Sequence, residues 1–242
     1  MVTEEMATTP KKKADLKVVI IGDMSVGKST LIQRYLSGKF QDTLSQTIGA
    51  AFFLKQWGPY NIAIWDTAGE EKFSGLSSFY CRNARAAIMA YDISERESFD
   101  SLYARHLPLL QQGAEEDCLV IAVGTKLDLV TPNTREVTNE EGEKFAYDAN
   151  PSRFQDGTRT DLRIPFYETS SVTGENVDNV FTYIFKTLLP LDPEGNPIEP
   201  NAARKRSPDV VDLENPSNAG NAGKSSKESE RLPPQGKKAG CC

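Results

Sequence analysis

One glycine-rich segment of the chain could bind phosphate: Gly22-Asp23-Met24-Ser25-Val26-Gly27-Lys28-Ser29. It follows an apolar stretch and opens a helix-like one, the context in which backbone N–H groups at a helix N-terminus wrap an anion. In this pattern Lys28 reaches the terminal phosphates of a nucleoside triphosphate, and the Ser29 hydroxyl ligates Mg²⁺. ATP-binding enzymes share this loop, so it does not choose the base. The predicted phosphate-binding residues are Gly22, Asp23, Ser25, Val26, Gly27, Lys28, Ser29 and Thr30.

A second segment, Thr125-Lys126-Leu127-Asp128, could recognise guanine. The Asp128 carboxylate can accept hydrogen bonds from the ring N–H and the amine of guanine, whereas adenine offers the opposite pattern. The stem of Lys126 can pack against the ring. Further along, Glu168-Thr169-Ser170-Ser171 follows an apolar stretch, where backbone N–H groups could meet the guanine carbonyl. The residues predicted to surround the base are Thr125, Lys126, Asp128, Ser170, Ser171 and Val172.

Two other segments could complete a magnesium site and a hydrolytic one. Trp65-Asp66-Thr67-Ala68-Gly69-Glu70 would place Asp66 in the Mg²⁺ shell, through water, and the Gly69 N–H near the terminal phosphate. Thr47 is spaced to reach the same ion from a mobile loop. The predicted metal set is therefore Ser29, Thr47 and Asp66, and the predicted catalytic residues are Lys28, Gly69 and Glu70.

The elements that must position these residues alternate between short apolar runs and helix-like patterns. That alternation predicts an α/β fold with a mostly parallel sheet and helices on both faces. Residues 51–60, with the turn Gly58-Pro59, predict one antiparallel edge strand and bring the sheet to six strands. The other expected strands are 16–21, 62–65, 86–91, 119–123 and 165–167, and the expected helices are 29–36, 98–110, 139–147 and 177–189.

Composition divides the chain into a leader, a domain and a tail. Residues 1–14 predict a disordered leader, 15–190 a nucleotide-binding domain with an enlarged surface loop at 148–164, and 191–242 a disordered tail. A net charge of −6 argues against a nucleic-acid polymer as partner. No apolar run approaches the roughly 20 residues that span a bilayer. The single histidine, His106, lies far in sequence from every motif and is predicted to be a surface or boundary residue.

From about Leu16 to Leu189 the chain resembles the Ras superfamily, and within it the Rab family of vesicle-trafficking GTPases. The resemblance rests on the segments above, on Tyr80, and on the terminal pair Cys241-Cys242. It implies a P-loop small G domain that binds GTP or GDP with Mg²⁺, with Phe40 packing against guanine opposite Lys126. It also implies geranylgeranyl groups on Cys241 and Cys242, and two lipid chains are what stable anchoring needs.

The resemblance further implies a switch that recruits effector proteins in its GTP-bound state. The other implied partners are an exchange factor, a GTPase-activating protein, a prenyl-transfer escort and a GDP-dissociation inhibitor, around a chain that is itself monomeric. The implied location is the cytoplasmic face of an intracellular membrane, endosomal, phagosomal or Golgi, with cycling through the cytosol.

The chain departs from the family pattern at three places. Thr125 stands where the family has Asn, and Ser171-Val172 where it has Ala-Lys; both changes predict weaker guanine binding. Glu70 stands where the family has a catalytic Gln, and a carboxylate cannot donate a hydrogen bond, which predicts slow hydrolysis. Two alternatives therefore stay open: a GTP-binding scaffold with little or no hydrolysis, and an ATP-using P-loop enzyme.

Overall fold

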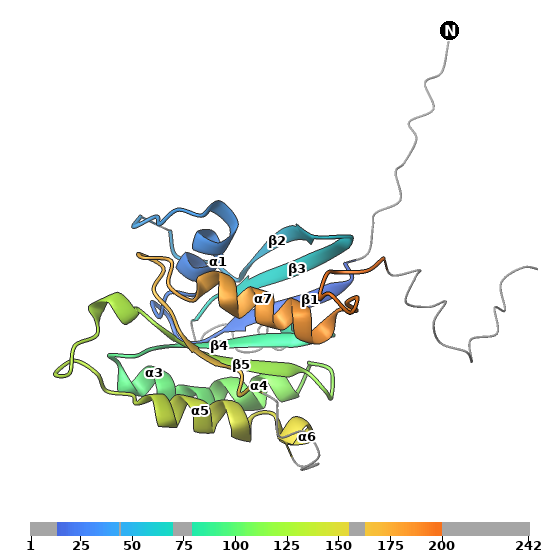
Figure 1. Ribbon diagram of the computed structural model, residues 1–242. Coiled ribbons are helices and arrows are strands. Elements are labelled where there is room, and N and C mark those ends of the chain that lie inside the picture. The colour runs from blue at the N-terminus through green and yellow to red at the C-terminus, as the bar shows by residue number, and fades with distance from the viewer. Residues whose placement is uncertain (1–13, 44, 70–78, 155–162, 200–242) are drawn as a thin grey trace, which may run out of the picture. The chain divides into compact units, whose positions relative to one another are not determined.

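The computed structural model describes residues 14–43, 45–69, 79–154 and 163–199 (Figure 1). They belong to a unit that ends at Arg206, and Ser207–Cys242 form a second unit. The described part contains a six-stranded sheet in the order β2-β3-β1-β4-β5-β6, in which only β2 runs antiparallel to its neighbour. The fold prediction is thus confirmed. The strands are β1 Leu16–Ile21, β2 Ala50–Trp57, β3 Tyr60–Thr67, β4 Ala86–Asp92, β5 Leu119–Thr125 and β6 Phe166–Glu168.

Helices cover both faces of this sheet. α1 and α7 pack on one face, and α3, α4 and α5 pack on the other (Figure 1). Within the described ranges, no helix has the length and apolar character that crossing a bilayer requires. The helical segments are α1 Lys28–Ser37, α3 Arg96–Ser101, the π-helical turn η2 Leu102–His106, α4 Leu107–Gln111, the 3₁₀ turn η3 Leu127–Leu129, α5 Asn139–Asp148, α6 Pro151–Phe154 and α7 Val177–Leu188.

The two cores explain why β1 is a continuous apolar run. Successive strand side chains point to opposite faces, and here both faces are covered. Val18 and Ile20 are fully buried against α1 and α7, whereas Val19 is fully buried in the core beneath α3 and α5. β1 is thereby held between two helical layers, and the loop that follows it starts from a fixed point.

One predicted helix, 98–110, is broken into three pieces. α3 ends at Ser101, η2 follows, and the Leu107 N–H donates to the Leu102 carbonyl, five residues back. Pro108 explains the break, because a proline has no N–H to donate to the carbonyl four residues earlier. A π-helical turn accommodates the mismatch by widening the helix locally, and such turns are frequent at functional sites.

Two predicted boundaries also differ from the structure. The loop expected at 148–164 contains the short helix α6, and its residues 155–162 lie outside the described part. Residues 190–199, here called the C-terminal strap, fall almost wholly within the tail expected from residue 191, but they fold back on the β2–β3 hairpin. The Tyr60 hydroxyl donates to the Ile198 carbonyl at 2.5 Å, and Leu191 forms an antiparallel bridge with Pro197.

The strap can pack closely against the turn of the hairpin because that turn contains a glycine. Gly58 has a positive φ of 56°, and a Cβ on it would lie 2.4 Å from Pro197 Cγ. The start of the domain meets the same hairpin: the Asp15 N–H donates to the Asn61 carbonyl at 2.9 Å, and the Asn61 N–H donates to an Asp15 carboxylate oxygen at 2.7 Å. These contacts join residues far apart in sequence, which local composition does not reveal.

Candidate nucleotide-binding site

The glycine-rich segment forms the turn between β1 and α1. A Cβ on Gly22 would lie 2.1 Å from the Ala90 carbonyl oxygen, so the loop can cross β4 only with glycine at this position. Gly27 precedes α1 with φ +95°, a left-handed conformation that glycine adopts without strain. The loop therefore ends at the N-terminus of α1, where unpaired N–H groups favour an anion.

Lys28 crosses this loop and is almost fully buried. Its Nζ donates to the Asp23 carbonyl at 2.7 Å, and its side chain lies in the cavity that the loop encloses. Burial lowers the pKa of Lys28 to about 8, and the nearby carboxylates of Asp66 and Asp23 oppose that shift. A phosphate beside Nζ would favour the charged form. The Lys28 ammonium is thus positioned to bind a polyanion.

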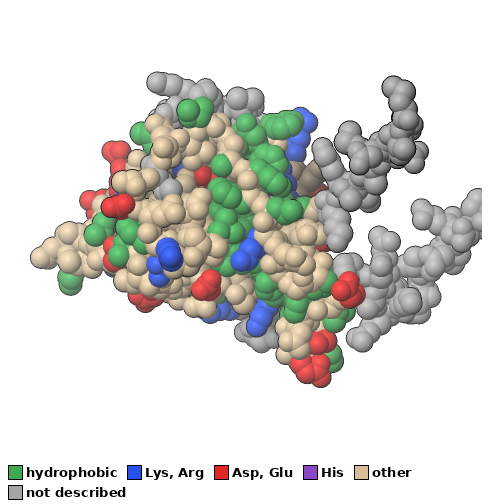
Figure 2. All heavy atoms as spheres, turned by 90° about the horizontal axis from the view of Figure 1, so that it is seen from above, with side chains coloured by type: hydrophobic (Ala, Val, Ile, Leu, Met, Phe, Trp, Pro, Cys, Tyr) green, Lys and Arg blue, Asp and Glu red, His purple; other side chains and the backbone are tan. Residues whose placement is uncertain are grey.

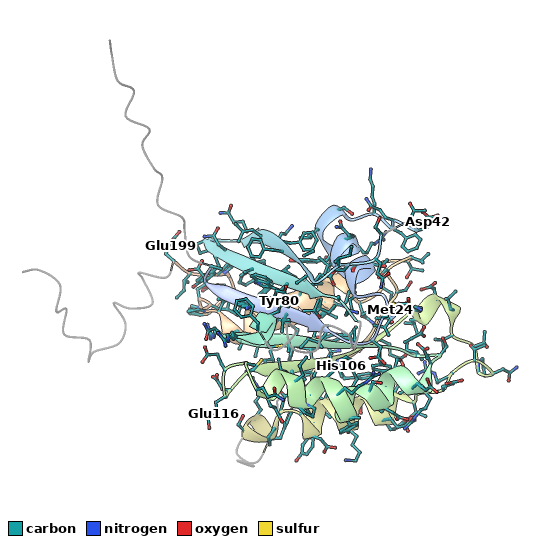
Figure 3. All side chains as sticks on the ribbon, turned by 180° about the vertical axis from the view of Figure 1, so that it is seen from behind. Met24, Asp42, Tyr80, His106, Glu116 and Glu199 are labelled. Carbon is teal, nitrogen blue, oxygen red and sulfur yellow. The ribbon has the colours of Figure 1, made fainter. Side chains whose placement is uncertain are left out.

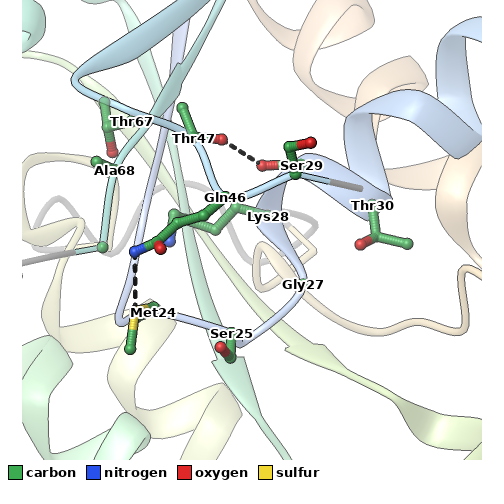
Figure 4. Close-up of a pocket in the computed structure, with 12 residues that line it drawn as sticks. Met24, Ser25, Gly27, Lys28, Ser29, Thr30, Gln46, Thr47, Thr67 and Ala68 are labelled. Atoms are coloured by element: carbon green, nitrogen blue, oxygen red, sulfur yellow. Dashed lines mark hydrogen bonds between the residues drawn. The ribbon is translucent and has the colours of Figure 1, made fainter. Parts of the chain in front are cut away.

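The three residues of the predicted metal set, which come from three separate segments, meet in space. Ser29 Oγ lies 2.8 Å from Thr47 Oγ1 (Figure 4), and both hydroxyls contact Asp66 Oδ2, at 2.5 and 2.8 Å. Asp66 is buried, and its Oδ1 has no hydrogen-bond partner among the described residues. An unpaired carboxylate oxygen in the interior is costly unless an ion or water satisfies it. This all-oxygen set fits Mg²⁺, which binds through one or two protein ligands and keeps several waters.

The end of β3 approaches the phosphate loop closely. A Cβ on Gly69 would lie 2.3 Å from the Met24 backbone nitrogen, so a glycine is required for this approach. Met24, Lys28, Thr47 and Gly69 line one cavity of about 420 Å³, shown in Figure 4. The predicted catalytic residue Glu70 lies outside the described residues, as do Cys241 and Cys242.

A second cavity, of about 200 Å³, lies beside the first, and both are lined by Ser25, Gly27 and Thr30. The shared lining makes the two cavities one elongated site, with the phosphate loop at one end. The residues expected around the base form the other end. Phe40, Thr125, Lys126, Asp128, Ser171 and Val172 all line it, and this cavity thus brings together four segments of the chain.

Hydrogen bonds hold the two base-side loops together. Ser170 Oγ donates to Asp128 Oδ1 at 2.6 Å, so this predicted base residue orients the carboxylate. Lys126 has φ 60°, and its Nζ lies 2.6 Å from Asp92 Oδ2. Although burial opposes ionisation of Asp92, hydrogen bonds from Lys126 and Ser94 hold the pKa of its carboxyl below the ordinary value. Asp92 ends β4 and was missed by the sequence reasoning, which sought contacts to the ligand itself.

Thr125 joins the base side to the phosphate side. It is 3% exposed, and its hydroxyl is 2.5 Å from the Val26 carbonyl and 2.8 Å from the Tyr91 carbonyl, so one proton serves two acceptors. Val26 belongs to the phosphate loop and Tyr91 to β4. Where the family has Asn, this threonine still anchors the loop that carries Lys126 and Asp128.

His106, predicted to be a surface or boundary residue, is half-buried in the structure and lies against the phosphate loop. Its Nε2 lies 2.7 Å from Asp23 Oδ1, and the neighbouring Arg105 donates to Asp23 Oδ2 at 2.8 Å. Both residues belong to η2, the turn that Pro108 forces on the helix. The sequence signal that could have indicated this contact is the proline itself, whose position marks where the helix must change course.

Comparison with known proteins agrees with this geometry. The Ras family matches residues 17–190. Ras-related protein Rab-20 of Homo sapiens is 36% identical over 263 residues, covering 96% of this chain and 99% of that protein. Rab-20 of Mus musculus is 38% identical over 212 residues, covering 74% and 87%. Ras-related protein Rab-12 of Homo sapiens is 35% identical over 192 residues, covering 76% and 72%.

A family match across the whole described domain, with a relative that is aligned almost end to end, leaves little of the chain outside the comparison. The chain belongs to the Ras family, within which it is a divergent Rab-type small GTPase similar to Rab-20.

Proposed function

We propose that this chain binds GTP and GDP with Mg²⁺, hydrolyses GTP slowly, and recruits effector proteins while GTP is bound. The observation that carries the proposal is the convergence of Ser29, Thr47 and Asp66 beside the buried Lys28, in a cavity continuous with the Asp128 pocket. Family membership supports the same reading, because the Rab family is one of trafficking GTPases.

The residues divide the work of hydrolysis between them. Lys28 would hold the terminal phosphates, and Ser29, Thr47 and Asp66 would hold the ion together with its waters. Mg²⁺, when bound, neutralises charge on the β- and γ-phosphate oxygens. Gly69 would present its N–H to the γ-phosphate from the end of β3. Lys28 and the loop can therefore position and stabilise without Glu70, and positioning and charge stabilisation account for most of the catalysis.

An exposed hydrophobic surface next to Thr47 supports effector recruitment. Phe52 on β2 packs edge-on against Trp65 on β3 at 5.2 Å between ring centroids, and Trp65 lies 5.8 Å from Tyr80. Phe52 is 53% exposed, and Ile48, the residue after Thr47, is 86% exposed. Figure 2 shows hydrophobic side chains gathered on the side of the molecule where β2 lies. A partner bound here would sense whether Thr47 is held by the ion.

The tail carries the proposed membrane anchor. Geranylgeranyl groups on Cys241 and Cys242 would attach the chain to the cytoplasmic face of an endosomal, phagosomal or Golgi membrane, and release by a GDP-dissociation inhibitor would return it to the cytosol. A prenyl-transfer escort would load the two lipids, and an exchange factor and an activating protein would drive the switch. The apolar character of two chains is what makes such anchoring stable.

A GTP-binding scaffold is the alternative that Glu70 favours. A carboxylate near the γ-phosphate repels it and cannot donate to it, although it can still accept a proton from the attacking water. We expect an unassisted rate of about 10⁻⁴–10⁻³ per second, as for a Ras-type site without a partner. If an activating protein accelerates hydrolysis in the parent but not in Glu70→Ala, Glu70 is itself catalytic.

Competition and single-turnover measurements test the proposal. A fluorescent GTP analogue should be displaced by GTP and GDP but not by ATP, and chelation of Mg²⁺ should speed its release. Single-turnover hydrolysis should then give a slow but measurable rate. Displacement by ATP as effective as by GTP would contradict the guanine assignment, and a rate of zero with an activating protein present would favour the scaffold.

A further inference from the structure

An arginine and a histidine of the π-helical turn η2 both contact one carboxylate of the phosphate loop. Arg105 donates to Asp23 Oδ2 at 2.8 Å, and His106 Nε2 lies 2.7 Å from Asp23 Oδ1. The carboxylate can only accept, so Nε2 carries the proton that is shared. Figure 3 shows His106 next to Met24, the residue that follows Asp23 in the loop. Both oxygens of one carboxylate are therefore occupied by neighbouring residues of one helix turn.

The π-helical turn is what allows two consecutive residues to reach one carboxylate. In a regular helix neighbouring side chains point about 100° apart, whereas a π-helical turn widens the helix and changes their directions. Ser101, the last residue of α3, accepts from Arg105 Nη2 at 2.5 Å and donates to the Glu97 carbonyl, so it helps to hold the guanidinium nitrogen that also donates to Asp23. The grip thus depends on the local distortion that Pro108 imposes.

Asp23 lies where its charge matters for a bound polyphosphate. Its backbone carbonyl accepts from Lys28 Nζ at 2.7 Å, so Asp23 lies directly beside the ammonium that would bind phosphate. While burial lowers the pKa of Lys28, the Asp23 carboxylate is close enough to oppose that shift. A carboxylate within reach of the ammonium is also within reach of the phosphate that the ammonium would hold. Unless it is compensated, it would repel a triphosphate more than a diphosphate.

The surroundings of this carboxylate make compensation necessary. A neighbouring cavity of about 390 Å³ is lined by Asp23 together with Glu95, Glu97 and Asp100. Arg105 lines the same cavity, and Arg96 pairs with Asp100 at 3.0 Å on the outer side. The electrostatic potential on this side of the phosphate loop is therefore negative, except beside Arg96 and Arg105. Removing Arg105 would leave a carboxylate of the loop facing three others.

We propose that Arg105 and His106 are positioning residues for the phosphate loop: both hold the Asp23 carboxylate turned toward η2, Arg105 offsets its charge, and the triphosphate is thereby favoured over the diphosphate. The proposal rests on the nucleotide binding proposed above. It assigns a role in ligand discrimination to a helix turn that contacts no part of the nucleotide. It also gives the π-helical turn a function, since a regular helix through residues 98–110 would not present both side chains to Asp23.

Arg105→Gln tests whether the charge of Arg105 matters, and adding Asp23→Asn tests whether the effect comes from the uncompensated Asp23 carboxylate. Arg105 is 44% exposed in its side chain, so screening limits the effect. We expect the Kd for GTP to rise about fivefold and that for GDP by about twofold or less, the upper range for a half-exposed ion pair. Arg105→Lys keeps the charge and should behave as the parent does. Adding Asp23→Asn to Arg105→Gln removes the uncompensated carboxylate and should restore most of the preference for GTP.

His106→Gln keeps a hydrogen-bond donor in place of the ring and should lose less GTP affinity than His106→Ala. Lys144→Gln is the matched control, because it removes one cation from an ion pair on α5, with Asp148 at 2.6 Å, far from the loop. Both dissociation constants are measured for each protein by displacement of a fluorescent nucleotide at low and high salt, with thermal unfolding recorded in parallel. The difference between GTP and GDP should shrink as salt screens the charge.

Equal losses for GTP and GDP in Arg105→Gln would overturn the proposal, because they would indicate a loop that is merely loosened. A double variant no better than Arg105→Gln would also overturn it. If the parent itself bound neither nucleotide, the proposed function would fail instead. If the parent bound both and the Arg105 and His106 variants matched it, the nucleotide site would stand and the role of η2 would not.

Discussion

Replacing Thr125 by Val removes one hydroxyl and almost nothing else, since the two side chains have nearly the same shape. The hydroxyl is 2.5 Å from the Val26 carbonyl and 2.8 Å from the Tyr91 carbonyl, and the residue is 3% exposed. Water cannot replace a donor at such a buried position, so the two carbonyls lose it outright. An orphaned buried group costs about 1–3 kcal/mol, and we expect the free energy of unfolding to fall by that amount.

Nucleotide affinity should fall with it, because the lost hydroxyl ties the phosphate loop to the end of β5, from which the loop with Lys126 and Asp128 starts. If about 1 kcal/mol of the loss appears in binding, the Kd for GTP rises roughly fivefold. Denaturant unfolding gives the first quantity and displacement of a fluorescent nucleotide gives the second. Thr125→Ser keeps the hydroxyl and should retain most of the affinity.

Thr187→Val is the matched control for this experiment. Its hydroxyl donates to the Tyr183 carbonyl within α7, at 2.7 Å, so the same chemical change is made away from the nucleotide. It should cost some stability and leave the Kd unchanged. If Thr125→Val bound GTP as tightly as the parent and unfolded at the same denaturant concentration, the bridging role of this hydroxyl would be refuted.

Asp128→Asn should lose guanine selectivity and gain xanthine, whose carbonyl can accept from the new amide; GTP binding as tight as in the parent, measured by competition, would contradict the base assignment. Ser29→Asn should weaken Mg²⁺ binding in the triphosphate state and shift preference to GDP, so unchanged relative affinities would count against the metal role. Changing both Cys241 and Cys242 to Ser should leave the chain in the soluble fraction of lysed cells, and persistent membrane association would indicate another attachment. Because burial lowers the pKa of Lys28 to about 8, phosphate binding should be strongest below that pH and weaken above it as the ammonium loses its proton; a Kd for GTP that stays flat from pH 7 to 9.5 would refute this.

Strands and helices were predictable where the residues of a segment alone determine its structure. β1 has the predicted bounds, because a run buried on both faces reads as a strand without any reference to its neighbours. α5 begins at Asn139 as predicted, and the structure shows the local reason: Thr138 accepts from the Glu141 N–H while Glu141 accepts from the Thr138 N–H. Such a capping box involves only residues three apart.

The site was predictable for the same reason and to the same extent. Ser29, Thr47 and Asp66 could be placed at one point because each lies at or near the end of an element that meets the same edge of the sheet. Their mutual contacts, and the use of Thr125 as a bridge, depend on side-chain directions that spacing does not determine. The contact between His106 and Asp23 was not predicted, because the two residues are 83 positions apart and sequence distance is no guide to such a contact.

The hairpin that receives the C-terminal strap also receives the start of the domain. Asp15 and Ile198 both bond to it, at Asn61 and Tyr60, so the described domain begins and ends at one spot. β3 runs from this spot to Asp66, six residues on, which puts roughly 20 Å of strand between the two ends of the described domain and the metal set. A label attached at Asp15 or Ile198 would thus lie at the opposite end of β3 from the nucleotide cavity. Fluorophores or surface linkers attached there should report on nucleotide exchange without obstructing it.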